Sequence, residues 1–414
     1  MLKKYCKFLP VMIRFEKEII NNTEPAWTKK PALLADNDYR LFYRELYPYA
    51  DDPLFHIHLN VDYPFNLTGI LYFPKLKNNF EAEKDRIQLY SNQVFVTDSV
   101  ENIVPDFLMM MKGVIDSPDI PLNVSRSYLQ NDANVRKISA HITKKAADKL
   151  EESFKSNRED FEKKWDDIRI FIQYGMLSDE KFYDRAKNFC LLKTTDGKYF
   201  TIDEYTEKIR AQQTDKDKKL VYLYATDPVQ QHSFVTAAKG RDYEVLWMDS
   251  PVDAHFIGLL ERKLTDATFS RVDSDTIDKL VDKQDAMPSK LTKEQEQALE
   301  ALIEKMADKE KFKVSFESLS ENDSPLIITR DEFARRMRDM SVHGGMNFMG
   351  DMKENFNLIV NANHPLVSKV LLEPDGIKQH QLMHQAFDLA MLSQNLLKGE
   401  ELTRFIQHSL ELMR

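Results

Sequence analysis

The side chains best suited to metal or thiol chemistry in this sequence are two histidines and two cysteines. His380 and His384 stand four positions apart in a predicted helix, so both imidazoles could lie on one face of a zinc site. Gln381 follows the first histidine where a metalloprotease has its catalytic glutamate, and the nearby sequence offers no evident third ligand, so a surface or interface pair is the favoured interpretation. Cys6 lies in a terminal segment and Cys190 in an apolar run, and both are expected to be inert.

A second candidate site precedes a long predicted helix. Arg126 falls in or just before the first helical turn, where free backbone amides and the helix dipole favour an anion. A guanidinium at that place could bind a phosphate through two parallel hydrogen bonds. The plainer alternative is a capping box formed by Ser127 and Gln130, with Arg126 on the surface, and the pattern by itself favours this alternative.

The glycine content limits what nucleotide chemistry the chain can perform. Only 11 of the 414 residues are glycine, which is under half of what an average usage of about 7% predicts. Backbone phosphate cradles depend on glycine clusters, and the sole adjacent pair, Gly344 and Gly345, forms neither a Walker loop nor a dinucleotide fingerprint. We therefore expect any nucleotide to be held outside this sequence.

Composition predicts a globular protein of the cytoplasm. Hydrophobic residues make up 42% of the chain and charged residues 30%, which is far too apolar for a disordered protein. The net charge of -9 argues against a broad nucleic-acid-binding surface. Two distant cysteines suit a reducing compartment, and no segment reads as a signal peptide or a membrane span. Neither nucleic acid nor membrane is therefore expected as a partner.

Two kinds of periodicity divide the chain into strands and helices. Alternation of apolar and polar residues predicts strands between positions 56 and 97, with His56 and His58 in contact with solvent. Helical spacing follows through a long stretch rich in lysine and glutamate. The runs LVYLYAT and YEVLWM, each followed by a helix, predict a βαβ layer, and its glycine-free turn favours a purely structural role. The expected fold class is therefore a multidomain α+β or α/β protein.

Changes in pattern also predict the domain boundaries. The stretch from Lys283 loses apolar periodicity and contains Pro288, and Thr292 with Gln295 then fits a capping box that opens a new helix. We divide the chain into a large α/β subdomain at 1–150, a helical connector at 151–210, a small βαβ subdomain at 211–284 and a C-terminal dimerisation domain at 285–414.

Two apolar patterns in the last domain are candidates for binding surfaces. Phe333, Met337 and Met340 share one helical face, and Met346 and Met349 follow the glycine pair. Flexible thioethers suit a surface that adapts to several apolar partners, although the pattern alone favours core packing. The final helices carry more apolar residues than they could bury by themselves, which predicts a homodimer through the C-terminal helices. These residues are Leu382, Phe387, Leu389, Leu396, Phe405, Ile406, Leu410 and Met413.

Several longer motifs carry a resemblance to a known family. They are EPAWTKKP, GILYFPK, VFVTDSVENIVPDF, LNVSRSYLQ, YDRAKNFCLLK and NHPLVSKVLLE. These runs resemble the heat shock protein 90 chaperones, specifically the bacterial HtpG branch, and the likeness spans essentially the whole chain. What aligns is the middle domain followed by the C-terminal dimerisation domain. The family's N-terminal domain, which holds ATP, magnesium and the catalytic glutamate, has no counterpart in this sequence.

The resemblance implies a catalytic role for two residues. Arg126 matches the arginine that reaches the γ-phosphate of ATP, and Gln130 matches a glutamine that supports the same loop. Such an arginine stabilises the charge that spreads over the phosphoryl oxygens in the transition state. Both residues would act on a site held by the N-terminal ATPase domain. The chain by itself is therefore expected to bind neither ATP nor magnesium and to show no turnover.

The resemblance also implies that the chain binds non-native client proteins. Phe333, Met337 and Met340 match the client-contacting segment, and Trp27 matches a middle-domain tryptophan near the client path. On this basis we prefer a binding surface over core packing for the methionine cluster, including Met346 and Met349. The alternative from another functional class is a metal- or thiol-dependent enzyme that uses the βαβ layer.

Overall fold

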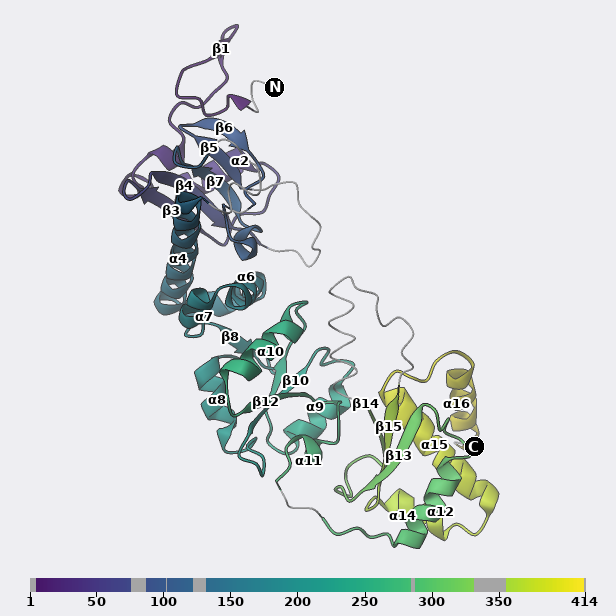
Figure 1. Ribbon diagram of the computed structural model, residues 1–414. Helices are drawn as coiled ribbons and strands as arrows, with labels where there is room; N and C mark the ends of the chain where they lie inside the picture. The colour runs from purple at the N-terminus through teal and green to yellow at the C-terminus, as the bar shows by residue number, and fades with distance from the viewer. Residues whose placement is uncertain are drawn as a thin grey trace. The chain divides into compact units, whose positions relative to one another are not determined.

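The chain forms two compact units, Met1–Leu191 and Leu192–Arg414 (Figure 1). The structure is a computed structural model that describes residues 5–75, 87–101, 103–121, 132–283, 287–330 and 355–412. Both units combine helices with small sheets, so the fold belongs to the multidomain mixed α and β class. Within the described ranges, no helix is long and apolar enough to cross a membrane.

A five-stranded sheet organises the first unit, with the strand order β3-β4-β7-β5-β6. All neighbouring strands are antiparallel except β5 and β7, which run parallel. The backbones of β4 and β7 approach closely because Gly69 and Gly113 lack side chains: a Cβ on them would lie 2.4 and 2.1 Å from a carbonyl oxygen of the opposite strand. The strands of this unit are β1 (Arg14–Phe15) and β2 (Glu18–Ile19), which form a separate hairpin, and β3 (Phe55–Val61), β4 (Leu67–Phe73), β5 (Gln88–Ser91), β6 (Val94–Thr97) and β7 (Lys112–Asp116).

Helices pack on this sheet through aromatic side chains. Residues of η1 and α2 meet Tyr72 and Tyr90 of the sheet in one apolar cluster, and Phe171 of α6 packs edge-on against Phe73, with the ring centroids 5.1 Å apart. Large aromatic rings bury much apolar area each, so these contacts dominate the stability of the unit. The helices are η1 (Ala26–Thr28), η2 (Pro31–Leu33), α2 (Asp36–Leu46), η3 (Asp106–Leu108), α4 (Ala133–Ser156), α5 (Arg158–Lys163), α6 (Trp165–Ser178) and α7 (Glu180–Ala186).

The helix α4 runs through the boundary that we expected at residue 150. It ends only at Asn157, whose φ of -154° and ψ of 88° leave helical geometry. The side chain of Asn157 then caps α5 by accepting a hydrogen bond from the amide of Asp160. Residue 150 therefore lies inside a continuous helix, because Asn157 is the residue that ends α4 and caps α5.

The second unit begins with a small subdomain, defined here as residues 192–283, which contains the predicted βαβ layer. Strand β10 lies between β11 and β12 and pairs parallel with both, which confirms that prediction. Its elements are β8 (Leu191–Lys193), β9 (Tyr199–Thr201), α8 (Ile202–Arg210), β10 (Leu220–Ala225), α9 (His232–Lys239), β11 (Val245–Trp247), α10 (Asp253–Lys263), β12 (Ala267–Arg271) and α11 (Ile277–Leu280).

The C-terminal domain, defined here as residues 287–412, packs helices on a three-stranded sheet. Helix α12 opens with the predicted capping box: Thr292 Oγ1 accepts from the amide of Gln295, and Gln295 Oε1 accepts from the amide of Thr292. Strand β15 lies in the middle of the sheet, parallel to β13 and antiparallel to β14. The elements are α12 (Lys293–Ile303), β13 (Phe312–Glu317), β14 (Leu326–Arg330), β15 (Phe356–Asn361), α14 (Pro365–Leu372), α15 (Gly376–Ser393) and α16 (Gly399–Leu412).

Candidate functional site

The candidate catalytic segment lies between two anchored pieces of the first unit. Arg126 and Gln130 themselves lie outside the described residues. On the entry side, Ser117 Oγ donates to the carbonyl oxygen of Asn66 over 2.6 Å, and Asp119 Oδ2 accepts from the amide of Asn66 over 2.6 Å. These two bonds tie the chain that leaves β7 to the loop before β4. The approach to the segment is therefore fixed by the sheet.

The exit from the segment is fixed by the start of α4. Asp132 caps this helix, because its Oδ1 accepts hydrogen bonds from the amides of Asn134 and Val135. The described helix begins at Ala133 with Asp132 as its cap, whereas the alternative capping box of Ser127 and Gln130 lies outside the described residues. A carboxylate at this end also interacts favourably with the helix dipole.

A hollow beside the first turns of α4 shows what ligand chemistry the neighbouring residues favour. Its volume is about 420 Å³, and its charged lining residues are Asp106, Arg136 and Asp179. Asp179 is also the cap of α7 and accepts from the amide of Phe182. Two carboxylates against one guanidinium do not favour a phosphate. The lining of this hollow therefore gives no support to a phosphate site among the described residues around it.

Trp27, expected near the path of client proteins, is a core residue in this fold. Its side chain is 1% exposed. The ring packs edge-on against Phe8 with centroids 4.7 Å apart, and its Nε1 donates to Asp116 Oδ2 over 3.2 Å. Asp116 also accepts from the amide of Gln93, so the buried carboxylate has two donors. In the single chain the indole therefore has no exposed face for a client, because η1 carries it into the aromatic cluster, and the expected client role of Trp27 stays a prediction.

Replacement of Trp27 should therefore change stability before it changes binding. We expect Trp27→Ala to lower the free energy of unfolding of the first unit by about 3–5 kcal/mol, through lost burial and the cavity that remains. Denaturant unfolding followed by tyrosine fluorescence and circular dichroism would measure this. Tyr49→Ala is the matched control, because Tyr49 is a fully exposed aromatic residue of the same unit. A Trp27→Ala protein of unchanged stability that binds clients more weakly would contradict the core assignment.

The two histidines of β3 are half-buried and contact Tyr39 of α2. Tyr39 stacks on His56 with ring centroids 3.7 Å apart, and its hydroxyl lies 2.9 Å from His58 Nδ1. Burial lowers the pKa of His56 to about 4, with a further contribution from the positive charge of Lys149. Burial also lowers the pKa of His58. Both imidazoles are therefore neutral at physiological pH, and because they are half-buried they contribute to packing while keeping some contact with solvent.

The methionine-rich segment joins two neighbouring strands of the C-terminal sheet. Phe333, Met337, Met340, Met346 and Met349 all lie outside the described residues. The ends of the segment are described: Arg330 of β14 is paired with Phe356 of β15, and its guanidinium lies 5.4 Å from the centre of the Phe356 ring. The chain therefore leaves and returns at the same end of the sheet.

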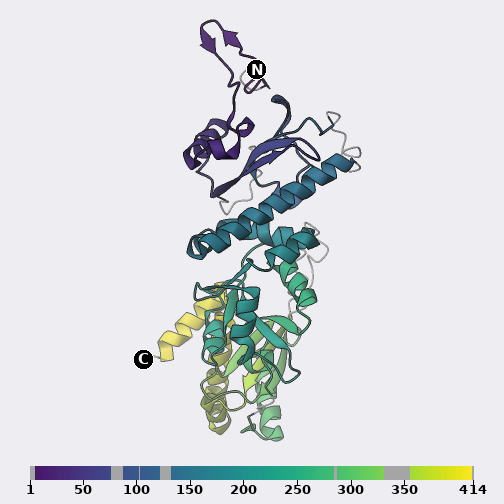
Figure 2. The same cartoon turned by 90° about the vertical axis from the view of Figure 1, so that its left-hand side faces the viewer.

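The final two helices expose an apolar surface. Ile406 and Leu410 of α16 are 50% and 56% exposed, and Leu389 and Leu392 of α15 are also exposed. In Figure 2, α16 (yellow) lies at the margin of the C-terminal domain and ends at the C-terminus. Other apolar residues of these helices, such as Phe387, are buried in the domain core. Met413 lies outside the described residues. Part of the surface expected to form the dimer contact is thus open in the single chain.

The histidines and cysteines considered for metal or thiol chemistry lie in surroundings typical of residues with a structural role. His384 Nδ1 lies 3.1 Å from Asp388 Oδ2, and the His380 ring centre is 6.0 Å from that of His384. Burial raises the pKa of Asp388, and His384 opposes the shift. In the part of the chain that the structure describes, no three His, Cys, Asp or Glu side chains are grouped to hold a metal. Cys190 is fully buried and Cys6 is half-buried.

Comparison with known proteins identifies the family. A family model described as Hsp90 protein matches residues 11–412. The chain belongs to the Hsp90 family. The chaperone protein htpG of Bacteroides fragilis strain YCH46 is 45% identical over an alignment that covers the whole chain and 73% of that protein. The chaperone protein HtpG of Porphyromonas gingivalis strain ATCC 33277 is 53% identical over 90% of the chain and 57% of its own length. A more distant HtpG, from Bdellovibrio bacteriovorus, is 26% identical over 90% of the chain.

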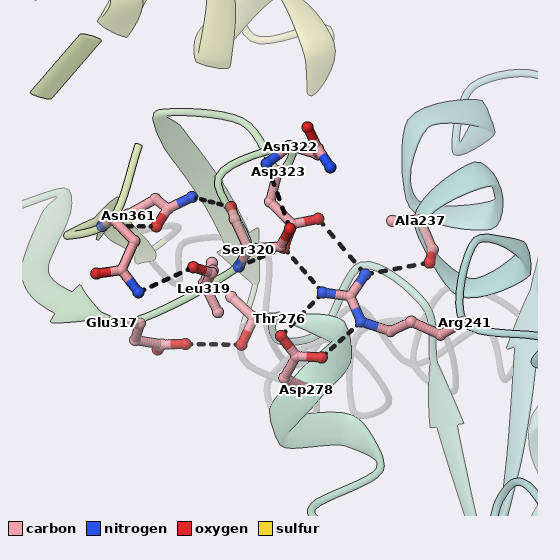
Figure 3. Close-up of polar contacts among 11 residues, drawn as sticks. Ala237, Arg241, Thr276, Asp278, Glu317, Leu319, Ser320, Asn322, Asp323 and Asn361 are labelled. Atoms are coloured by element: carbon pink, nitrogen blue, oxygen red, sulfur yellow. Dashed lines mark hydrogen bonds and ion pairs between the residues drawn. The ribbon is translucent and has the colours of Figure 1, made fainter. Parts of the chain in front are cut away.

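Membership of the Hsp90 family decides between the two functional classes that the sequence left open. The relatives are chaperones, and the alternative of a metal- or thiol-dependent enzyme receives no support from them. One group of polar residues in this Hsp90 chain centres on Arg241 (Figure 3). No sequence pattern predicted this group. The partners of Arg241, which are Asp278 and Asp323, are distant along the chain. Isolated charged residues of this kind are typical of any protein surface, so no pattern could have linked them.

Proposed function

We propose that this chain is the dimerising and client-binding part of an HtpG-type chaperone. The observation that carries the proposal is the match of the Hsp90 family model to residues 11–412. The exposed apolar residues of α15 and α16 support dimerisation, because a monomer has no second surface to cover them. The single chain would bind exposed apolar surface of non-native proteins. We further propose that it acts in the cytoplasm, with no nucleic acid or membrane as a partner.

The proposed client surface is the methionine-rich segment of the C-terminal domain. Phe333, Met337, Met340, Met346 and Met349 combine aromatic and thioether side chains that can adapt to many apolar sequences. The pairing of Arg330 with Phe356 supports the assignment, because it ties the segment to a folded sheet at both ends. Trp27 is left out of this surface, since its side chain is in the core.

Polar replacement of two methionines tests this surface. We expect Met337→Glu with Met340→Glu to reduce protection of an aggregating client at least about tenfold, because two proposed thioether contacts with the client are lost and two charges are introduced. Light scattering of a heated client protein would measure protection, and sedimentation would show whether the dimer persists. Met12→Glu with Met287→Glu is the matched control, because both methionines are exposed elsewhere. Unchanged protection in the Met337 and Met340 variant would contradict the client surface and favour the alternative that these residues pack in the core.

We also propose that the chain contributes to an ATPase site without holding the nucleotide. ATP and magnesium would be bound by the family's N-terminal ATPase domain, and ATP would supply the phosphoryl group that is transferred to water. Arg126 would donate hydrogen bonds to the phosphate oxygens, and Gln130 would hold the loop that carries Arg126. The anchors at Asn66 and Asp132 support this role, because they fix both ends of the segment. The chain alone would show no hydrolysis.

A further inference from the structure

The small subdomain and the C-terminal domain have separate apolar cores. One cluster of buried residues contains Leu223, Val245 and other side chains of the small subdomain. Another contains Ile328, Leu358 and other side chains of the C-terminal domain, and neither cluster includes a residue of the other part. Apolar contacts that cross a boundary hold two parts together without regard to salt or charge. Hydrogen bonds and ion pairs between charged and polar side chains cross the boundary between these two clusters.

Arg241 is the centre of the junction between the two parts (Figure 3). It follows α9 and forms two hydrogen bonds with Asp278 of the same subdomain, Nε to Oδ1 over 2.6 Å and Nη2 to Oδ2 over 2.9 Å. The same Nη2 also donates to Oδ2 of Asp323, in the C-terminal domain, over 2.8 Å. Burial by itself disfavours the charged guanidinium, but the bonds to both carboxylates outweigh it and raise the pKa of Arg241. The link between the two parts is therefore a charged one.

Asp323 is held in a braced turn. Its Oδ2 accepts from the amide of Ser320 over 3.1 Å. Asn361, at the end of β15, donates to the carbonyl oxygen of Ser320 over 2.8 Å, and the nearby Asn363 donates to that of Leu319 over 3.1 Å. Both asparagines are buried. The turn that presents Asp323 to Arg241 is thus fixed to the central strand of the C-terminal sheet.

A second polar contact crosses the same junction. Thr276 Oγ1 donates to Glu317 Oε2 over 2.7 Å, and the ammonium group of Lys279 forms an ion pair with Glu317. Glu317 lies at the end of β13, whereas Thr276 and Lys279 belong to the region of α11. The lysine side chain is about half exposed to solvent. This contact therefore adds a second charge pair that water and ions can reach.

We propose that Arg241 and Asp323 form a releasable latch between the small subdomain and the C-terminal domain. When the latch opens, Arg241 keeps its two bonds to Asp278, and Asp323 keeps its bond to Ser320. Neither charge is left buried without a partner, so the open state avoids the usual penalty for breaking a buried pair. The guanidinium and carboxylate side chains are 20% and 16% exposed, so ions reach them and screening favours opening.

The experiment measures the distance between the two parts in the whole chain. Spin labels at Val229→Cys and Leu372→Cys are suitable, because both side chains are more than four-fifths exposed and lie one in each part. Cys6 is replaced by serine, and a tenfold excess of unlabelled chain is added so that almost every labelled dimer carries a single labelled copy. We expect Asp323→Asn and Arg241→Gln each to at least double the width of the distance distribution. One molar sodium chloride should broaden it similarly in the labelled chain without these two substitutions.

Asp278→Asn is the matched control. It removes a carboxylate from the same arginine but leaves the bond to Asp323, so the distribution should keep its original width. Equal broadening by Asp278→Asn and Asp323→Asn would overturn the latch, because it would show a local role for Arg241. A width that neither the substitutions nor salt changes would also overturn it. The salt titration needs no latch substitution, so it decides the question even if a variant fails to fold.

Discussion

Arg126→Ala should lower ATP hydrolysis about a hundredfold in a mixture of this chain with the N-terminal domain of the Bacteroides fragilis relative. The loss is expected because a positioned donor that stabilises charge in the transition state contributes 10²–10³ in rate in comparable sites. Substrate affinity should change less, since the nucleotide is bound by the other domain. Release of inorganic phosphate at saturating ATP would measure the rate, and its dependence on ATP concentration would give KM.

Arg136→Ala is the matched control for this experiment. Arg136 lies in the first turns of α4, is exposed to solvent and carries the same charge, so its loss should leave the rate nearly unchanged. Equal losses in both variants would point to a general electrostatic effect between the two proteins. Hydrolysis by the chain alone that disappears in Arg126→Ala would contradict the proposal that the nucleotide is held elsewhere.

Ile406→Asp with Leu410→Asp should convert the proposed dimer into a monomer. In a symmetric interface each substitution occurs twice, and burial of one such side chain is worth about 1.5–3 kcal/mol. We therefore expect the dissociation constant of the dimer to rise more than about a thousandfold. Sedimentation velocity over a range of concentrations would measure it. The fold should persist, because both side chains are at least half exposed in the single chain.

A control for this prediction places the same chemical change on the first unit. Leu33→Asp with Leu41→Asp also introduces two carboxylates at exposed apolar positions, but on η2 and α2 instead of the C-terminal helices. This variant should remain a dimer. A dimer that survives Ile406→Asp with Leu410→Asp would show that the final helix does not complete the interface.

Local patterns predicted the elements of this chain well where the structure depends on neighbouring residues. The capping box of Thr292 and Gln295 is an interaction across one helical turn, and the βαβ layer follows from two apolar runs with a helix after each. No pattern in the sequence singled out Asp132, which caps α4. Ser127 and Gln130 have the right spacing for a cap, but Asp132 makes the bonds, and two acceptable caps close together cannot be ranked from spacing alone.

Contacts between distant residues were harder to predict. The burial of Trp27 depends on Phe8 and on Asp116 of β7, which only the folded sheet brings together. The same holds for Tyr39 above the two histidines of β3. In the candidate site, the resemblance could assign roles to Arg126 and Met337 by position, whereas the anchors at Asn66 and Asp132 required the structure. A motif can suggest the role of a residue, but only the folded structure shows which distant residues it contacts.

The strand order of the C-terminal sheet has a consequence for synthesis of the chain. Strands β13 and β14 each pair with β15, and β15 is the last of the three to leave the ribosome. The two earlier strands therefore emerge without their common partner, and the methionine-rich segment emerges before it as well. Until Asn361 has been added, β13 and β14 of the nascent domain have edges that β15 has not yet paired, and the methionine-rich segment follows directly after β14. A protein proposed to protect others from aggregation would thus itself be prone to aggregation while it is being synthesised.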